Sequence, residues 1–239
     1  ARPCVFEYIY FARPDSLING KCAYEYRKKF GIELAKESSI KADMVVPVPD
    51  SGVPAALGYA EYAKIKFELG LIRNHYVGRT FIEPTQHIRS LGVKLKLSST
   101  KSIVKNKSII LIDDSLVRGT TCHKIVKMLY EAGAKEVHVR IACPEIRFPD
   151  FYGVDMPTKK ELLASQKNNE EICKYIKAKS LKFLSLEGLY EGLNQGKRNK
   201  LYPQFSDHYF TGDYPIKPLD NLGEGKIKQL SLLSSKSSN

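Results

Sequence analysis

Tryptophan is absent from this chain of 239 residues, and methionine occurs only three times. Long apolar runs are also missing: none approaches the ~20 residues that a membrane-spanning helix needs. The stretch ARPCVFEYIYF at the start lacks the charged, apolar and small-residue order of a signal peptide. These absences exclude a helical membrane protein, and we expect a cytoplasmic protein with no membrane partner.

Cysteine is sparse, and no two cysteines form a C-x-x-C pair. The five are Cys4, Cys22, Cys122, Cys143 and Cys173. An odd, scattered set argues against a disulfide framework and for a reducing compartment. We interpret these cysteines as small core or half-core residues.

Acidic residues are outnumbered by basic ones, 26 against 38, which gives a net charge of +12. Such an excess suits an anionic partner, either nucleic acid or a polyphosphorylated small molecule, and equally a generally lysine-rich surface. No helix-turn-helix segment is visible, so we do not expect nucleic acid as the partner.

Strand-like and helical segments alternate along the chain. Helical patterns cover 20–37, 51–63, 120–132 with Thr120 or Thr121 as cap, 158–166, 168–176 and 185–193; strand patterns cover 42–49, 67–72, 108–113 and 136–142. This order with short loops predicts an α/β fold, a mostly parallel twisted sheet with helices on both faces. The segment 73–100 is irregular, and a long loop inside an α/β domain is usually functional.

One segment, IILIDDSLVRGTT (109–121), carries the strongest chemical signal. Asp113 and Asp114 stand at the carboxyl end of a buried strand, where open α/β sheets bind ligands. The loop after them carries one glycine and three hydroxyl side chains and leads into a helix N-terminus, which can bind phosphate through backbone N–H groups. Two carboxylates next to a phosphate site fit ribose hydroxyls or a divalent cation.

Other phosphate motifs are missing. The chain has neither G-x-x-x-x-G-K-[ST] nor a Rossmann glycine fingerprint. The pattern therefore indicates a site for a ribose 5-phosphate that carries a metal-bound group.

This pattern resembles the phosphoribosylpyrophosphate (PRPP) motif of the type I phosphoribosyltransferases. Further segments are similar to those of the glutamine PRPP amidotransferase family, from residue 4 to residue 215. They include CVFEYIYFARPDS (4–16), VPVPDSG (46–52), NHYVGRTFIEPTQHIR (74–89), FYGVDMPTKKELLA (151–164) and FTGDYP (210–215). The resemblance implies a type I phosphoribosyltransferase fold, and we assign residues 1–222 to this domain with a C-terminal helical extension. The end of the chain is rich in Ser, Lys and Gly, and this composition predicts a disordered tail at 223–239.

The family forms 5-phosphoribosylamine and pyrophosphate from PRPP and ammonia, the first committed step of purine synthesis. The resemblance implies that Asp113 and Asp114 bind the ribose hydroxyls and Mg²⁺, and that Ser51 also contacts the metal. Asp50 and Ser51 would belong to the pyrophosphate loop. The 5-phosphate would be held by the loop of Ser115, Leu116, Val117, Arg118, Gly119 and Thr120.

The family also has a loop that closes over PRPP and excludes water. It matches RNHYVGRTFI (73–82), which assigns Arg79 as its charged contact and Tyr76 as part of the seal. His75 stands where the family usually has arginine.

Two features of the family have no counterpart here. No glutaminase domain precedes Cys4, so ammonia would come from another domain or subunit or from solution. One branch of the family holds a [4Fe–4S] cluster, which needs four cysteine thiolates; Cys4 matches the first, while Asp150, Pro203 and Ser206 replace the rest. We expect no iron–sulfur cluster.

Two alternatives remain open. One is a PRPP-binding regulator without catalysis, and the other is a nucleobase phosphoribosyltransferase. The family further implies a homo-oligomer that purine nucleotides inhibit.

Overall fold

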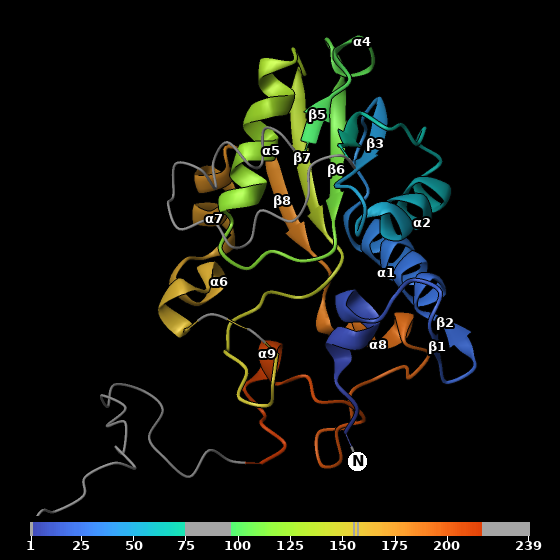
Figure 1. Cartoon of the computed structure of the whole chain (residues 1–239), viewed down its shortest axis with the longest axis vertical. Helices are drawn as coiled ribbons and strands as arrows, with labels where there is room; N and C mark the ends of the chain where they lie inside the picture. The colour runs from blue at the N-terminus through green and yellow to red at the C-terminus, as the bar shows by residue number, and fades with distance from the viewer. Residues whose placement is uncertain (1, 75–96, 155, 157, 217–239) are drawn as a thin grey trace, which may run out of the picture.

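A four-stranded parallel sheet lies at the centre of the structure (Figure 1). The computed structural model describes residues 2–74, 97–154, 156 and 158–216. The strands stand in the order β3 (Met44–Pro47), β6 (Ser108–Asp113), β7 (Glu136–Ile141) and β8 (Ser180–Phe183). Ile109 to Ile112 of β6 are completely buried, as expected for a parallel strand covered on both faces.

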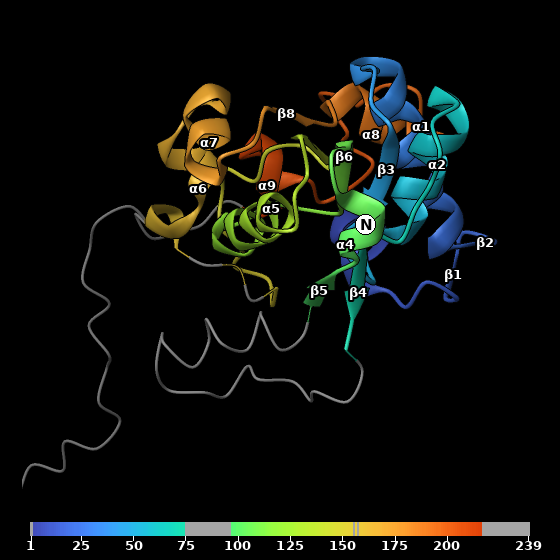
Figure 2. The ribbon, with the colours of Figure 1, turned by 90° about the horizontal axis from the view of Figure 1, so that it is seen from above.

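Helices cover both faces of this sheet. Helices α1 (Ala23–Ser38) and α2 (Val53–Ala63) pack together on one face, where α2 contacts β3 and β6. Helices α5 (Thr120–Glu131) and α7 (Asn169–Ile176) lie on the other face (Figures 1 and 2). The predicted α/β architecture is therefore confirmed.

The connections that follow β3 and β6 lead toward opposite edges of the sheet. After α2 the chain returns beside β3, where Phe67 makes a parallel bridge to Val45 on the side away from β6. After α5 the chain instead enters β7, on the far side of β6. The carboxyl ends of β3 and β6 thus flank the topological switch point, which is where open α/β sheets bind ligands.

Two glycines let α1 and α2 cross closely. A Cβ atom on Gly31 would lie 1.9 Å from the carbonyl oxygen of Ala55, and one on Gly58 would lie 1.9 Å from that of Lys28. No side chain fits at either position, so the contact is made by backbone. The crossing fixes α1 against the helix that follows β3.

Smaller elements surround the sheet. Strands β1 (Leu17–Ile18) and β2 (Lys21–Cys22) form a hairpin, so the helix predicted from residue 20 begins at Ala23. Strands β4 (Leu71–Arg73) and β5 (Leu97–Ser99) pair antiparallel at the ends of the segment predicted to be irregular, and α4 (Lys101–Val104) follows. The strand predicted at 67–72 is confirmed in part: its end, from Leu71, belongs to β4, whereas before it only Phe67 forms a bridge.

The C-terminal part contributes short helices and the strand β8, which the sequence pattern did not predict. The prediction for 158–166 is divided between a 3₁₀ turn η2 (Lys159–Glu161) and α6 (Leu163–Gln166); α8 (Leu186–Gly192) and α9 (His208–Thr211) follow. The side chain of Asn168 caps α7 by accepting a hydrogen bond from the backbone N–H of Glu171. The tail predicted at 223–239 lies outside the described residues.

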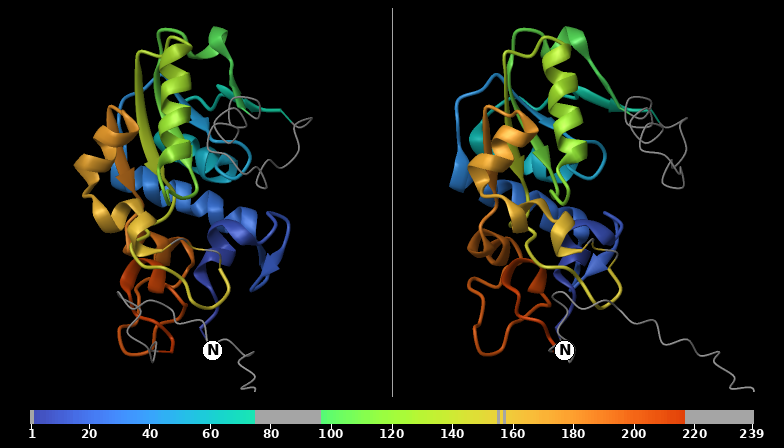
Figure 3. Two further views of the ribbon diagram at one scale, coloured as in Figure 1. Left: turned by 60° about the vertical axis from the view of Figure 1, so that its left-hand side comes forward. Right: turned by 90° about the vertical axis from the view of Figure 1, so that its left-hand side faces the viewer.

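The last described segment joins the first (Figure 3). Cys4 bridges Ser206, and the backbone N–H of Ser206 donates to the carbonyl of Pro3 at 2.9 Å. A buried chain of hydrogen bonds supports this contact: Ser206 Oγ lies 3.0 Å from His208 Nδ1, and His208 Nε2 lies 2.8 Å from Asp150 Oδ1. Burial lowers the pKa of His208 even though Asp150 opposes this shift.

The N-terminal π-helical turn η1 (Glu7–Phe11) lies next to this junction, and its residues Tyr8 and Ile9 are buried. Among the described helices, none is both long and apolar enough to cross a membrane.

The crossing of α1 and α2 leads to a stability prediction. Gly31→Ala forces a methyl group against the Ala55 carbonyl, so the helices must separate. We expect the free energy of unfolding, measured by urea denaturation, to fall by about 1–3 kcal/mol, the usual range for overpacking. Lys36→Ala on the exposed face of α1 is the matched control and should change it little. A Gly31→Ala variant as stable as the parent would show that the helices are not in backbone contact.

Candidate functional site

The acid pair lies where β6 ends. Asp113 is the last residue of the strand and is half-buried, and Asp114 is only 7% exposed. Asp113 Oδ1 accepts a hydrogen bond from the backbone N–H of Asp114 at 2.9 Å, and Asp114 Oδ1 accepts one from Ser115 Oγ at 2.5 Å. The two aspartates therefore lie in and directly after the end of the strand, and they are not part of a solvent-exposed turn.

Burial and mutual repulsion govern the charge of this pair. Burial first, and then the charge of Asp114, raise the pKa of Asp113 well above its ordinary value. Burial also raises the pKa of Asp114, against the opposing effects of hydrogen bonding from Ser115 and Ser51 and of the positive charge of Arg27. Sugar hydroxyls or a cation placed here would favour the ionised form.

The loop after β3 reaches the same place. Its Ser51 acts on Asp114 through hydrogen bonding, which brings together two residues that are 63 positions apart. Gly52 makes this approach possible, because a Cβ atom there would lie 2.6 Å from the carbonyl oxygen of Ile112 in β6. The sequence PDSG thus lies at the switch point beside the acid pair, as the family resemblance implied.

The loop from Ser115 to Thr120 ends at the N-terminus of α5. Gly119, with φ of +72°, occupies the N-cap position, and no side chain caps this helix. The prediction of a Thr120 or Thr121 cap is therefore wrong, since Thr120 is already the first helical residue. Free N–H groups and the positive end of the helix dipole make this terminus suitable for an anion.

The side chains of this loop differ in what they can offer a ligand. Leu116 is buried and Val117 is half-buried, so they can offer a ligand only their backbone. Arg118 points elsewhere: its guanidinium binds Glu161 of η2, with both Nε and Nη2 3.1 Å from Oε1. Of the loop residues assigned to the 5-phosphate, Ser115 and Thr120 supply the hydroxyl groups.

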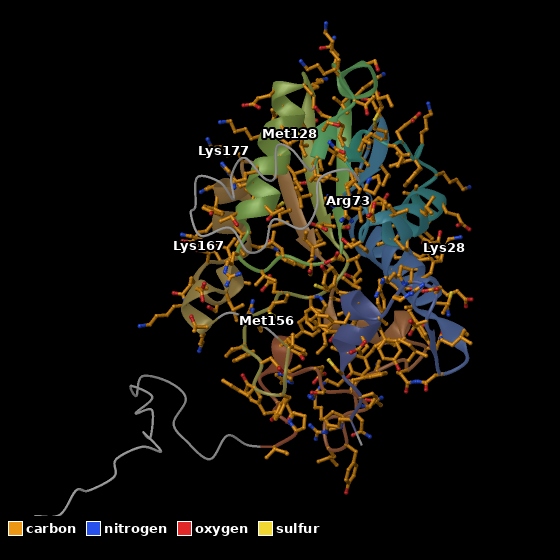
Figure 4. All side chains as sticks on the ribbon, in the orientation of Figure 1. Lys28, Arg73, Met128, Met156, Lys167 and Lys177 are labelled. Carbon is orange, nitrogen blue, oxygen red and sulfur yellow. The ribbon has the colours of Figure 1, made fainter. Side chains whose placement is uncertain are left out.

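A surface ion pair stands at the edge of the site. Arg73, labelled in Figure 4, is the last residue of β4, and its Nη1 lies 2.5 Å from Asp50 Oδ2. Asp50 is exposed. The pair places one cation beside the loop that the sequence assigned to pyrophosphate. Tyr76 and Arg79, assigned to the covering loop, lie outside the described residues.

The sequence reasoning missed Arg27. This residue of α1 is 5% exposed, and its charge acts on Asp114. A signal was present, because position 27 follows Ala23 by four residues and precedes Phe30 by three, on the apolar face of the helix. A charged residue at such a position needs buried partners.

Three of the positions that match iron–sulfur ligands, Cys4, Asp150 and Ser206, come together in the structure, but their side chains do not fit a cluster. Cys4 is the one cysteine among them, and its Sγ lies 3.4 Å from Tyr209 Oη. Asp150 is occupied by His208 and by the backbone N–H groups of Tyr152 and Val154, at 2.8 and 2.7 Å. The absence of a cluster stays a prediction, and the buried hydrogen bonds described above occupy these side chains.

Comparison with known proteins places the chain in a family. The model of the phosphoribosyl transferase domain matches residues 27–149, slightly more than half of the chain, and this range contains both loops of the site.

Curated relatives are similar over most of this chain. The amidophosphoribosyltransferase of Rhizobium etli is 58% identical over 98% of the chain, and that of Methanocaldococcus jannaschii is 55% identical over 82%. The chain covers 47% and 41% of these proteins, so it spans about half the length of the curated relatives it matches, or less.

A solved structure agrees. Glutamine PRPP amidotransferase from B. subtilis, complexed with ADP and GMP, is 50% identical with a TM-score of 0.81, over 90% of this chain and 47% of that one. The fold, the matched domain and these identities have one consequence: the chain belongs to the phosphoribosyl transferase domain family.

Proposed function

We propose that this chain is the phosphoribosyltransferase half of an amidophosphoribosyltransferase of de novo purine synthesis. It would form 5-phosphoribosylamine and pyrophosphate from PRPP and ammonia. One observation carries the proposal: paired carboxylates, a serine hydroxyl and an uncapped helix N-terminus meet at one switch point. They do so in a chain 58% identical to an enzyme of that name.

Each part of PRPP has a matching group. The backbone N–H groups of 115–120 would hold the 5-phosphate at the α5 terminus. Asp113 and Asp114 would accept hydrogen bonds from the ribose hydroxyls. The loop of Asp50 and Ser51 would lie beside the pyrophosphate, with Arg73 offsetting the charge of Asp50.

The reaction replaces the bond from C1 to the pyrophosphate oxygen by a bond from C1 to nitrogen. The ribose carbon becomes cation-like as pyrophosphate leaves, so the protein needs mainly to position the substrates and to stabilise charge. Tyr76 and Arg79 would belong to a loop that covers PRPP and prevents its hydrolysis.

The residues present fit Mg²⁺. Two adjacent carboxylates, with the oxygen of Ser51 near them, are the hard donors that this ion prefers. In the described part of the chain no group of three or more His, Cys, Asp or Glu could hold a metal ion. The metal would therefore use Asp113, Asp114 and Ser51 together with substrate oxygens and water. When bound, it would neutralise charge on the diphosphate.

We also propose a source of ammonia, a class of inhibitor, a location and an oligomeric state. A glutaminase domain or subunit would supply ammonia, since the chain spans about half of its relatives. Purine nucleotides would inhibit, because the similar B. subtilis structure is complexed with ADP and GMP. We also propose a cytoplasmic homo-oligomer.

The test of the activity uses the purified chain with PRPP, Mg²⁺ and ammonium chloride at alkaline pH, and measures pyrophosphate. Release that requires ammonia is the expected result. Release only with a nucleobase would instead support a nucleobase phosphoribosyltransferase. PRPP binding without release would support a regulator.

The acid pair leads to a mutational prediction. Asp113→Asn with Asp114→Asn should lower ammonia-dependent pyrophosphate release by about a hundredfold or more, because it removes preorganised charged contacts to the substrate. Circular dichroism should show an intact fold. Glu131→Gln, at the exposed end of α5, is the matched control and should keep full activity. An active double variant would disprove the site assignment.

The acid pair also leads to a stability prediction: replacing Asp113 should raise the stability of the ligand-free chain, although it lowers activity. The pKa of Asp113 is raised in the folded state, so the folded chain binds this proton more tightly than the unfolded chain does. Stability is therefore lost as the pH rises above the unfolded pKa of about 4. Without ligand at pH 7, Asp113→Asn should raise Tm by roughly 2–4 °C, the shift that about 1 kcal/mol produces at this size.

Calorimetry across pH checks this expectation. The gain should shrink as the pH approaches 4, where the wild-type carboxyl is already protonated. An unchanged or lower Tm at pH 7 would mean that the repulsion between the carboxylates is relieved within the protein.

A further inference from the structure

Backbone binding of a phosphate group requires the loop 115–120 to keep one shape. N–H groups hold an anion well when they already point to one place, because a loop that must become ordered on binding loses affinity. The strand β6 fixes the start of this loop, and α5 fixes its end. The middle of the loop, from Leu116 to Gly119, needs support from another part of the fold.

The first residue of α6 supplies this support through its backbone. The N–H of Leu163 donates to the carbonyl oxygen of Val117 at 2.9 Å. The N–H groups in the first turn of a helix have no partner within the helix, so this donor is available to the loop. Figure 1 shows α6 below the loop that joins β6 to α5. The bond therefore joins two segments that are distant in the sequence.

The side chain of Leu163 contacts the same loop. A Cβ atom on Gly119 would lie 2.5 Å from Leu163 Cδ2 and 3.2 Å from Tyr175 Cε1. Leu163 is only 9% exposed, so its side chain is enclosed between the loop and the rest of the fold. Gly119 is thus packed against α6 and α7, and the loop has no room to move toward these helices.

An ion pair on the same side adds a weaker link. Glu161 Oε1 accepts a hydrogen bond from Arg118, and Glu161 Oε2 accepts one from Thr158 Oγ1 at 3.2 Å. Arg118 and Glu161 are both about half exposed, and exposed ion pairs contribute little to stability. The backbone bond of Leu163 is therefore the main link, and the ion pair keeps the Arg118 guanidinium beside η2.

The bond from Leu163 also sets the direction of the next N–H group in the loop. The peptide between Val117 and Arg118 is trans, so the Val117 carbonyl and the Arg118 N–H point in opposite directions. Because the carbonyl points to α6, the N–H of Arg118 points away from α6. Within the described residues, this N–H donates to no backbone acceptor. It is thus available to an anion at the N-terminus of α5.

We propose that Leu163 is a positioning residue for the 5-phosphate: its N–H anchors the Val117 carbonyl and so aims the N–H of Arg118 at a phosphate bound before α5. This inference rests on the proposed function, because it assumes a ribose 5-phosphate as the ligand. Leu163 itself touches no ligand atom in this account. It acts through the backbone of the loop.

The experiment removes the N–H of Leu163 and leaves the helix in place. Leu163→Pro lacks this donor. Proline is accepted at the first position of a helix, and Leu162 already has the extended ψ of 111° that a residue before proline prefers. Leu163→Ala is the matched control, because it also shortens the side chain but keeps the N–H. Circular dichroism checks that both variants fold.

Calorimetric titration with ribose 5-phosphate gives the first readout. We expect its Kd to be about five- to tenfold higher in Leu163→Pro than in Leu163→Ala, as for the loss of one hydrogen bond and of the loop order that it maintains. Magnesium pyrophosphate, whose proposed contacts are Asp50 and Ser51, should bind the two variants with Kd values within about twofold of each other. A general disturbance of the fold would weaken the binding of both ligands.

NMR of the wild-type chain gives the second readout, which needs no variant to fold. The amide of Leu163 should be protected from exchange with solvent even without a ligand. Ribose 5-phosphate should shift the amide resonance of Arg118 and slow its exchange. Magnesium pyrophosphate alone should leave the exchange of this amide unchanged.

The outcomes separate the two proposals. Equal Kd values for ribose 5-phosphate in the two variants overturn the role of Leu163. An equal weakening of both ligands in Leu163→Pro also overturns it, and so does an Arg118 amide that ribose 5-phosphate does not protect. A wild-type chain that binds ribose 5-phosphate as expected but releases no pyrophosphate with ammonia overturns only the proposed function.

Discussion

Repulsion between two adjacent buried carboxylates is the constraint around which this site is built. Asp113 and Asp114 could separate only by breaking the end of β6, because Asp113 still pairs with β7. The surrounding groups lower the cost instead: Ser51 and Ser115 offer hydroxyl hydrogen bonds, and Arg27 offers a positive charge. Ser115 adjoins the acid pair, but Ser51 and Arg27 come from two other places in the sequence, so these groups come together only when the chain folds. A site with unrelieved charge is ready for a ligand that supplies the missing partners.

The site also requires backbone segments to approach each other closely. Gly52 lets the loop after β3 lie against β6, and Gly31 and Gly58 let α1 lie against α2. The first contact brings Ser51 to the acid pair, and the second sets the helix that carries Arg27. The geometry of the site therefore depends on positions without side chains as much as on the residues that would bind substrate.

The sequence predicted the strands that are apolar and buried, and it predicted both site loops, because their chemistry is local. It missed β8, since SLKF is short and carries a lysine. It placed the α5 cap on threonine, because Gly119 takes a left-handed conformation that composition does not reveal. Arg27 lies on the apolar face of α1, but its partners are carbonyls of the preceding segment, 15 to 20 residues away, and helical periodicity alone does not identify them.

The pairing of Cys4 with Ser206 has a consequence for the order of folding. The apolar stretch that begins at Val5 finds its partners Phe205 and Tyr209 only after some two hundred further residues have been synthesised. During translation this stretch can pack against Tyr26 of α1, but the surface that Phe205 and Tyr209 cover stays exposed until they are made. Closure of the molecule is thus a late, long-range event, with the loop-closure entropy that such contacts require.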